Sequence, residues 1–293
     1  MIVVTAPTST IGRQVLGTLL DEDEPVRVVA RDPSKLSDEQ HDRVEVVPGS
    51  HGDPEVVDAV FAGADTVFWL PPPNPRAESV EAVFVDFARP ACDAMTKHGV
   101  ERVVGVSALG RGTAMAGNAG YVTGSLAMDD LIAGTGVSYR ALTMPSFMDN
   151  TARQAELIKT QGMFTGAVSG DRKAPTCATR DIAAVASRLL RDRSWSGVAE
   201  VPVLGPEDLS FDDMARIMSD VLARPVRYQQ VSGESSKAQL LEFGMSEAMA
   251  QGMLDMALAK DAGLDNGVRR TPETSTPTSF RQWCEDVLEP IVA

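Results

Sequence analysis

In the first half of the chain, short apolar runs rich in valine and isoleucine alternate with segments whose apolar residues recur at helical spacing. Each run is long enough for one strand, and the segments between them are long enough for one crossover helix. This alternation is typical of parallel strands buried on both faces. The expected strands cover residues 1–6, 26–31, 44–49, 65–73, 101–110 and 137–144, and the expected helices 11–22, 54–64, 79–99 and 125–136.

The second half is less regular. Residues 180–192 and 210–223 have amphipathic helical patterns, and residues 234–263 predict helices rich in methionine. Strand candidates lie at 200–205 and 226–231. A polar loop (266–279) precedes a last helix (279–289). The predicted fold class is therefore α/β: a doubly wound parallel sheet (1–150) with a smaller C-terminal α+β lobe (151–293). The alternative is that the two form one continuous domain.

Charge and cysteine usage narrow the class of protein. Lys+Arg 27 against Asp+Glu 41 gives a net charge of −14, which disfavours nucleic-acid partners. No apolar run reaches the ~18 residues of a membrane span. Cysteines and histidines are few, and none are spaced along the chain as metal ligands usually are. We therefore expect no disulfide framework and no metal site, and the scarcity of cysteine favours a cytoplasmic location. They are Cys92, Cys177, Cys284, His41, His51 and His98.

The turn after the first strand has the position of a dinucleotide-binding loop. It reads Ala6-Pro7-Thr8-Ser9-Thr10-Ile11-Gly12. Here the chain resembles the NmrA-like branch of the atypical short-chain dehydrogenases/reductases, which usually carry G-A-T-G-x-x-G. Of the three glycines only Gly12 is present, with Ala6 and Ser9 at the other two places.

The resemblance implies a Rossmann fold with cofactor contacts from Thr8, Ser9, Thr10, Ile11 and Gly12. Ala6 is costly only if its backbone needs a positive φ, and the Ser9 hydroxyl could donate to a phosphate oxygen. The following helix N-terminus offers free N–H groups to an anion. The alternative is a degenerate loop that binds nothing.

Basic residues at the end of the second strand indicate the cofactor. Arg31 stands 19 residues after Gly12, and Lys35 follows shortly. Arginine at this position accommodates the 2′-phosphate of NADP, whereas an acidic residue favours NAD. We therefore expect NADP, with NAD possible. The alternative is a solvated Arg31 paired with Asp32.

The family resemblance extends along nearly the whole chain. It places Leu70 and Pro71 on the adenine–ribose side of the cofactor, and Pro145 in the family's signature after the sixth strand. Ser50 replaces an aspartate that lies near the adenine in relatives. The matching segments are 29–36, 47–53, 59–73, 101–110, 134–150, 180–190, 203–215 and 276–283.

The catalytic residues of the family are altered. Tyr121 stands where Tyr-x-x-x-Lys would begin, but Ser125 replaces the lysine, and a His/Glu pair of other relatives corresponds to Ser125 and Asp129. Tyr121 near Ser107 could polarise a carbonyl by hydrogen bonding. With no cation beside it, its pKa should stay near ~10. The candidate catalytic residues are thus Tyr121, Ser107 and Ser125, unless Tyr121 only anchors a loop.

Other candidates are weaker. The glycine-rich loop 110–120 could overhang the substrate as a lid or be a flexible surface loop. Phe147, Met148 and Met163 could line an apolar pocket, although most methionines should be core. Cys177 has no adjacent base, so we expect it to be buried and inert.

Three functions are compatible with these residues. The first is an NAD(P)H-dependent reductase that acts on a small, hydrophobic, aromatic carbonyl, quinone or activated alkene. The arginine bias, 21 Arg to 6 Lys, is typical of a GC-rich bacterium, and in such organisms the family resemblance implies a role in tailoring aromatic natural products. The second is a dinucleotide-binding redox sensor, and the third is a cofactor-independent enzyme in which Ser9, Tyr121 and Asp129 are the polar groups. The oligomeric state is left open.

Overall fold

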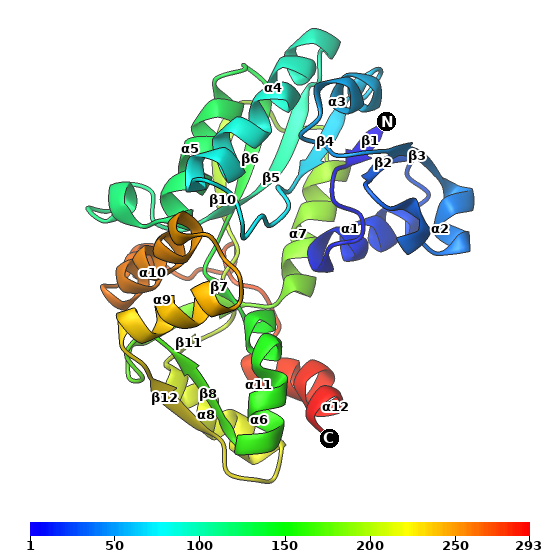
Figure 1. Cartoon of the computed structure of the whole chain (residues 1–293). Helices are drawn as coiled ribbons and strands as arrows, with labels where there is room; N and C mark the ends of the chain where they lie inside the picture. Colours follow the sequence, from blue (N-terminus) through cyan, green and yellow to red (C-terminus); the bar gives the residue numbers. More distant parts are fainter.

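A computed structural model describes residues 1–293 and contains a seven-stranded, wholly parallel sheet (Figure 1). Its strand order is β10-β6-β5-β4-β1-β2-β3, which reverses direction beside β1, as in a doubly wound Rossmann sheet. All six strands predicted in the first half are present. They are β1 (Ile2–Val4), β2 (Val26–Ala30), β3 (Val44–Pro48), β4 (Thr66–Trp69), β5 (Arg102–Ala108) and β6 (Ser138–Met144), joined by β10 (Val198–Pro202).

Helices cover both faces of this sheet. On one face, α1 (Thr10–Asp21) and α7 (Thr179–Arg191) bury their apolar stripes against the strands. On the other face lie α3 (Pro54–Phe61), α4 (Phe87–His98) and α5 (Tyr121–Ala133). Between β2 and β3 lie η1 (Pro33–Lys35) and α2 (Asp38–Arg43).

The helix predicted at 79–99 is divided. A π-helical turn, η2 (Ala82–Asp86), precedes α4, and Pro90 lies inside α4. Proline has no N–H to donate to the carbonyl four residues earlier, so the regular α pattern is interrupted here.

The C-terminal lobe has its own small sheets and core. Phe164, Phe280 and Trp283 are almost fully buried in that core. Its strands are β7 (Ser146–Phe147), β8 (Met163–Gly166), β9 (Ala174–Cys177), β11 (Asp208–Leu209) and β12 (Arg227–Gln230). Its helices are η4 (Met148–Gln154), α6 (Ala155–Gln161), α8 (Phe211–Val221), α11 (Phe280–Trp283), η6 (Cys284–Leu288) and α12 (Glu289–Val292).

The chain returns to the main sheet after first leaving it. Between the lobe's segments, α7 packs beside α1 and β10 pairs in parallel with β6. A boundary at residue 150 therefore marks only the first point at which the chain passes from the main sheet into the C-terminal lobe. The division into 1–150 and 151–293 stays a prediction.

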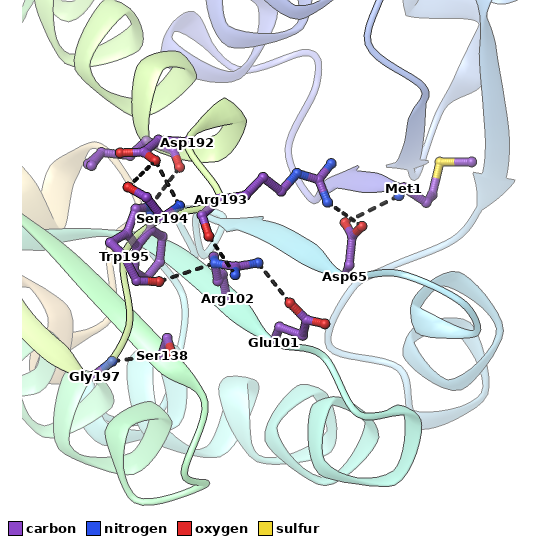
Figure 2. Close-up of polar contacts among 11 residues, drawn as sticks. Met1, Asp65, Glu101, Arg102, Ser138, Asp192, Arg193, Ser194, Trp195 and Gly197 are labelled. Carbon is purple, nitrogen blue, oxygen red and sulfur yellow. Dashed lines mark hydrogen bonds and ion pairs between the residues drawn. The ribbon is translucent and has the colours of Figure 1, made fainter.

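Polar contacts hold the returning segment at the amino end of the sheet (Figure 2). The guanidinium of Arg102 donates to the carbonyls of Arg193 (2.8 Å) and Trp195 (3.2 Å). Arg193 also pairs with Asp65, which accepts from the terminal ammonium of Met1 at 3.2 Å. These contacts lie at the sheet edge opposite to the carboxyl ends of the strands, where a doubly wound fold binds its ligand.

A helical hairpin spans the two lobes over the carboxyl ends of the strands (Figure 1). It consists of α9 (Gly233–Glu242) and α10 (Glu247–Asp261), followed by η5 (Leu264–Gly267). At the start of α10, the Ser246 amide donates to the carbonyl of Pro75; at its end, Asp261 accepts from the amide and hydroxyl of Ser169. No helix of the chain combines the length and apolarity needed to cross a bilayer.

Candidate functional site

The loop between β1 and α1 is closed by Ser9. As the N-cap of α1, its Oγ accepts from the Gly12 amide (2.9 Å) and donates to the carbonyl of Ala6 (2.9 Å). The single hydroxyl proton of Ser9 is used within its own loop in this structure, and its donation to a phosphate stays a prediction. The amides of Thr10 and Ile11 have no acceptor within the chain and remain available to an anion at the helix N-terminus.

The loss of two glycines does not strain this loop. Neither Ala6 nor Ser9 has a positive φ, so a side chain is tolerated at both positions. Gly12 is different, because a Cβ there would collide with the carbonyl oxygen of Ala6. The one family glycine that remains is the one that close helix–strand packing requires.

A cleft of about 270 Å³ opens at the ends of β2, β3 and β4. Arg31 lies on its wall and forms no ion pair. Lys35 does not line the cleft; its ammonium lies 3.8 Å from Asp32, so the predicted convergence of two basic residues was wrong. The lining residues are Arg31, Ser50, Pro72, Pro73, Asn74, Ala82, Val83 and Phe87.

A buried histidine that sequence reasoning missed lies next to this cleft. The ring of His51 packs edge-on against Trp69 (5.2 Å) and Phe87 (5.0 Å), and its Nε2 lies 3.0 Å from the carbonyl oxygen of Leu70. Burial, with a smaller effect of the Arg31 charge, lowers the pKa of His51 to about 4. His51 is therefore neutral at pH 7; its position directly after the third strand was the available signal.

These residues fit a dinucleotide. The free amides of Thr10 and Ile11 suit a pyrophosphate, and the cleft beside Arg31 suits an adenosine with a 2′-phosphate. Leu70 and Pro71 follow β4, and Pro145 follows β6, so all three lie at the same sheet edge. The assignment of individual residues to the cofactor remains a prediction.

A second polar group lies at the end of β5. The Ser107 hydroxyl donates to Oδ2 of Asp129, and the Tyr139 hydroxyl donates to its Oδ1 at 2.6 Å. Ser125 reaches Ser107 at 3.5 Å between the two Oγ atoms. Asp129 is 3% exposed. Burial raises its pKa to about 6, against the opposing effects of its two hydrogen bonds and of Arg111.

Small residues make this arrangement possible. A Cβ on Gly105 would lie 2.4 Å from the hydroxyl oxygen of Tyr139, so only glycine lets that ring cross β5 to reach Asp129. In the sequence, Asp129 stood out as the altered member of a family pair and as a polar group of the cofactor-independent alternative. Its partner Tyr139 lies on a different strand, and no local pattern predicts their contact.

The loop 110–120 is held in place. Arg111 forms ion pairs with Asp130 (2.9 Å) on α5 and Glu200 (2.8 Å) on β10, and lies 3.8 Å from Asp129. Ala119 is fully buried in a cluster with residues of α5, α10 and η5. The element that covers the strand ends is therefore α10, and this loop supports it.

Tyr121 does not form a pair with Ser107. It begins α5, packs edge-on against Phe84 at 6.1 Å and lies beside Gly252 of α10. The chain provides no hydrogen bond between Tyr121 and Ser107. Burial raises the pKa of Tyr121 to about 12, above the expected value, so its hydroxyl is a weaker acid than predicted and is even less ionised at neutral pH. The structure thus joins Ser107 with Ser125 and leaves Tyr121 facing α10.

The remaining candidates are largely core. Met148 and Cys177 have no exposed surface, and Met163 has little. Burial raises the pKa of the Cys177 thiol well above its ordinary value, as expected of an inert cysteine. Phe147 is half-buried, so of the three residues expected to line an apolar pocket it has the side chain that is partly exposed.

The fold and this site define a nicotinamide-dinucleotide-binding protein, and comparison with known proteins agrees. The chain belongs to the NAD(P)H-binding family, whose model matches residues 8–193. It is 28% identical to the NAD(P)H azoreductase of Xenophilus azovorans, over 87% of this chain and 86% of that protein. It is 29% identical to the (4-alkanoyl-5-oxo-2,5-dihydrofuran-3-yl)methyl phosphate reductase of Streptomyces griseus, over 99% of this chain and 98% of that protein.

The same fold occurs in solved reductases. The crystal structure of the triphenylmethane reductase of Citrobacter sp. complexed with NADP(H) superposes with a TM-score of 0.79 at 20% identity, covering 98% of this chain and 99% of that one. The predicted Rossmann fold and NmrA-like resemblance are confirmed. The expected class, an NAD(P)H-dependent oxidoreductase, agrees with the relatives.

Proposed function

We propose that the protein is an NADPH-dependent reductase that transfers a hydride to a small, hydrophobic carbonyl or quinone. The observation that carries this proposal is the unpaired Arg31 on the wall of a cleft at the end of β2. The neighbouring strand β1 leads into a helix N-terminus with free amides. In a chain of net charge −14, a guanidinium without a carboxylate partner suits a phosphate from outside the chain. The reductases among its relatives support the reaction class.

The site residues have separate tasks in this proposal. The Thr10 and Ile11 amides bind the pyrophosphate, and Arg31 binds the 2′-phosphate. The bound nicotinamide supplies the hydride. Leu70, Pro71 and Pro145 keep the strand ends apolar, and the half-buried rings of Tyr121 and Phe147 offer contact area to an aromatic substrate.

Calorimetric titration of cofactor-stripped protein with NADPH and NADH tests the proposal. Arg31→Ala should weaken NADPH binding about tenfold to a hundredfold, the value of a hydrogen bond to a charged group, and change NADH binding little. Lys35→Ala is the matched control, because it also removes a cation from this segment but not from the cleft. Failure of both nucleotides to bind would overturn the proposal.

A second candidate is a redox sensor that binds the dinucleotide without turnover. The separation of Tyr121 from Ser107 favours it, since the usual proton donor of short-chain reductases is not assembled. Oxidation of NADPH in the presence of menadione, a small quinone, distinguishes the two. A sensor would bind NADPH and leave menadione unreduced.

A further inference from the structure

Ser107 lies near the carboxyl end of β5, on the side of the sheet where a doubly wound fold binds its ligand. A serine hydroxyl has one proton, and the Ser107 proton points to Oδ2 of Asp129. While Asp129 is ionised, Ser107 can therefore accept a hydrogen bond but cannot donate one to a substrate oxygen. Protonation of Asp129 at Oδ2 reverses this bond, because the carboxylic acid then donates to Ser107. The Ser107 proton becomes available to a substrate oxygen at the carboxyl ends of the strands.

We propose, resting on the reductase function above, that Asp129 and Ser107 form a two-step proton relay that replaces the missing Tyr-Lys pair. Ser107 is the catalytic residue that touches the substrate oxygen. Asp129 is the positioning residue and proton reservoir behind it, reached only through Ser107. Tyr139 fixes the orientation of the Asp129 carboxyl group, because its hydroxyl donates to Oδ1 and leaves Oδ2 to contact Ser107.

The relay balances the hydride transfer. With a carbonyl substrate the hydride adds to the carbonyl carbon, and the C=O π pair moves to the oxygen. With a quinone the hydride adds to one oxygen, and an electron pair moves through the conjugated ring to the other oxygen. That oxygen takes the proton of Ser107 as the O–H bond breaks, and Ser107 takes the proton of Asp129 at the same time. The products are the hydroquinone or alcohol, oxidised nucleotide and an Asp129 carboxylate, which takes a proton from solvent before the next turnover.

The groups around Asp129 come from five elements. Ser107 (β5) and Tyr139 (β6) donate to it, and Ser125 shares α5 with it. Asp130 and Glu200 neutralise Arg111, the one nearby cation. The other titratable group near this cluster is Cys92 of α4, which lies close enough to act on Tyr139.

The balance of these effects leaves Asp129 able to hold a proton. Burial outweighs its two hydrogen bonds and Arg111, so its pKa rises to about 6. The acid and the carboxylate are therefore both populated close to neutral pH, as a proton reservoir requires.

The test measures NADPH oxidation with menadione between about pH 5 and about pH 8. In the wild-type protein, kcat should fall above about pH 6 as Asp129 loses its proton. Asp129→Asn should lose this pH dependence, because its amide donates to Ser107 at every pH. Tyr139→Phe removes a donor to the carboxylate and should shift the midpoint upward by about one pH unit or more. Ser107→Ala should lower kcat at every pH.

Asp220→Asn is the control, since it makes the same chemical change on the exposed side of α8. It should keep the wild-type profile. A second readout needs no turnover: difference infrared spectra should show the carbonyl band of a protonated carboxylic acid that titrates near pH 6 and is absent in Asp129→Asn.

The outcomes separate the relay from the function. A wild-type pH profile in Asp129→Asn, or an Asp129 ionised at every pH, would overturn the relay while leaving the reductase intact. Bound NADPH with no oxidation in any variant would overturn the reductase and the relay together. A pH dependence lost in Asp129→Asn and kept in Asp220→Asn, with the infrared band, supports the relay.

Discussion

The carbonyl oxygen of Ala6 lies 1.8 Å from the point where a Cβ on residue 12 would stand. We expect Gly12→Ala to push α1 away from β1, lowering the unfolding free energy by about 3 kcal/mol and abolishing dinucleotide binding. Denaturant unfolding and calorimetry measure the two effects. Gly17→Ala is the matched control in the same helix, because its Cβ would meet nothing within 4 Å; it should be neutral or stabilise by up to about 1 kcal/mol.

Protonation of His51 should destabilise the fold. Its folded pKa of about 4 lies below the ordinary 6.5, so the unfolded chain takes up a proton that the folded chain refuses. The His51 contribution is thus fully present above about pH 6.5 and is lost as the pH falls through about 4, a change of about 3 kcal/mol. Urea unfolding across this range, compared with His51→Gln, measures it.

The exposed His41 is the control for His51. His41→Gln should leave the pH dependence of unfolding as in the wild-type protein. An unchanged slope in His51→Gln would show that His51 is protonated equally in both states.

Asp129 should have the opposite effect on stability. Its folded pKa of about 6 exceeds the ordinary 3.8, so the folded state holds a proton that the unfolded state releases. Its contribution is fully present below about pH 4 and is lost as the pH rises through about 6, by about 3 kcal/mol. The unfolding free energy of the wild-type protein minus that of Asp129→Asn should fall by that amount from about pH 4 to about pH 7. A constant difference would contradict it.

The close packing of α10 against the start of α5 depends on two glycines, Gly252 and Gly120. A Cβ on Gly252 would lie 2.6 Å from Val80 and 3.1 Å from the Tyr121 ring, and the Gly252 carbonyl oxygen lies 1.9 Å from where a Cβ on Gly120 would stand. Gly252→Ala should lift α10 from α5, lower the unfolding free energy by about 1–3 kcal/mol and raise KM for menadione more than it lowers kcat.

Gly117→Ala serves as the control for the α10 variant, because its Cβ would meet nothing within 4 Å. It should leave both KM and the unfolding free energy unchanged within about 0.5 kcal/mol. If Gly252→Ala behaves in the same way, α10 does not shape the substrate site.

The alternation of strands and helices could be predicted from the sequence, because burial on both faces of a parallel sheet imposes continuous apolar runs that are visible locally. The sequence also indicated the dinucleotide loop and the position of Arg31, since both are set by their distance along the chain from the first strand. Gly12 was recognisable for the same reason.

Which polar groups contact one another could not be predicted from the sequence. Asp129 and Tyr139 lie on different elements, and their contact depends on the space that Gly105 leaves in a third. The burial of His51, the distance of Lys35 from the cleft and the use of the Ser9 proton within its own loop likewise follow from three-dimensional packing. Desolvation and hydrogen bonding act through space, and a sequence pattern records only neighbours along the chain.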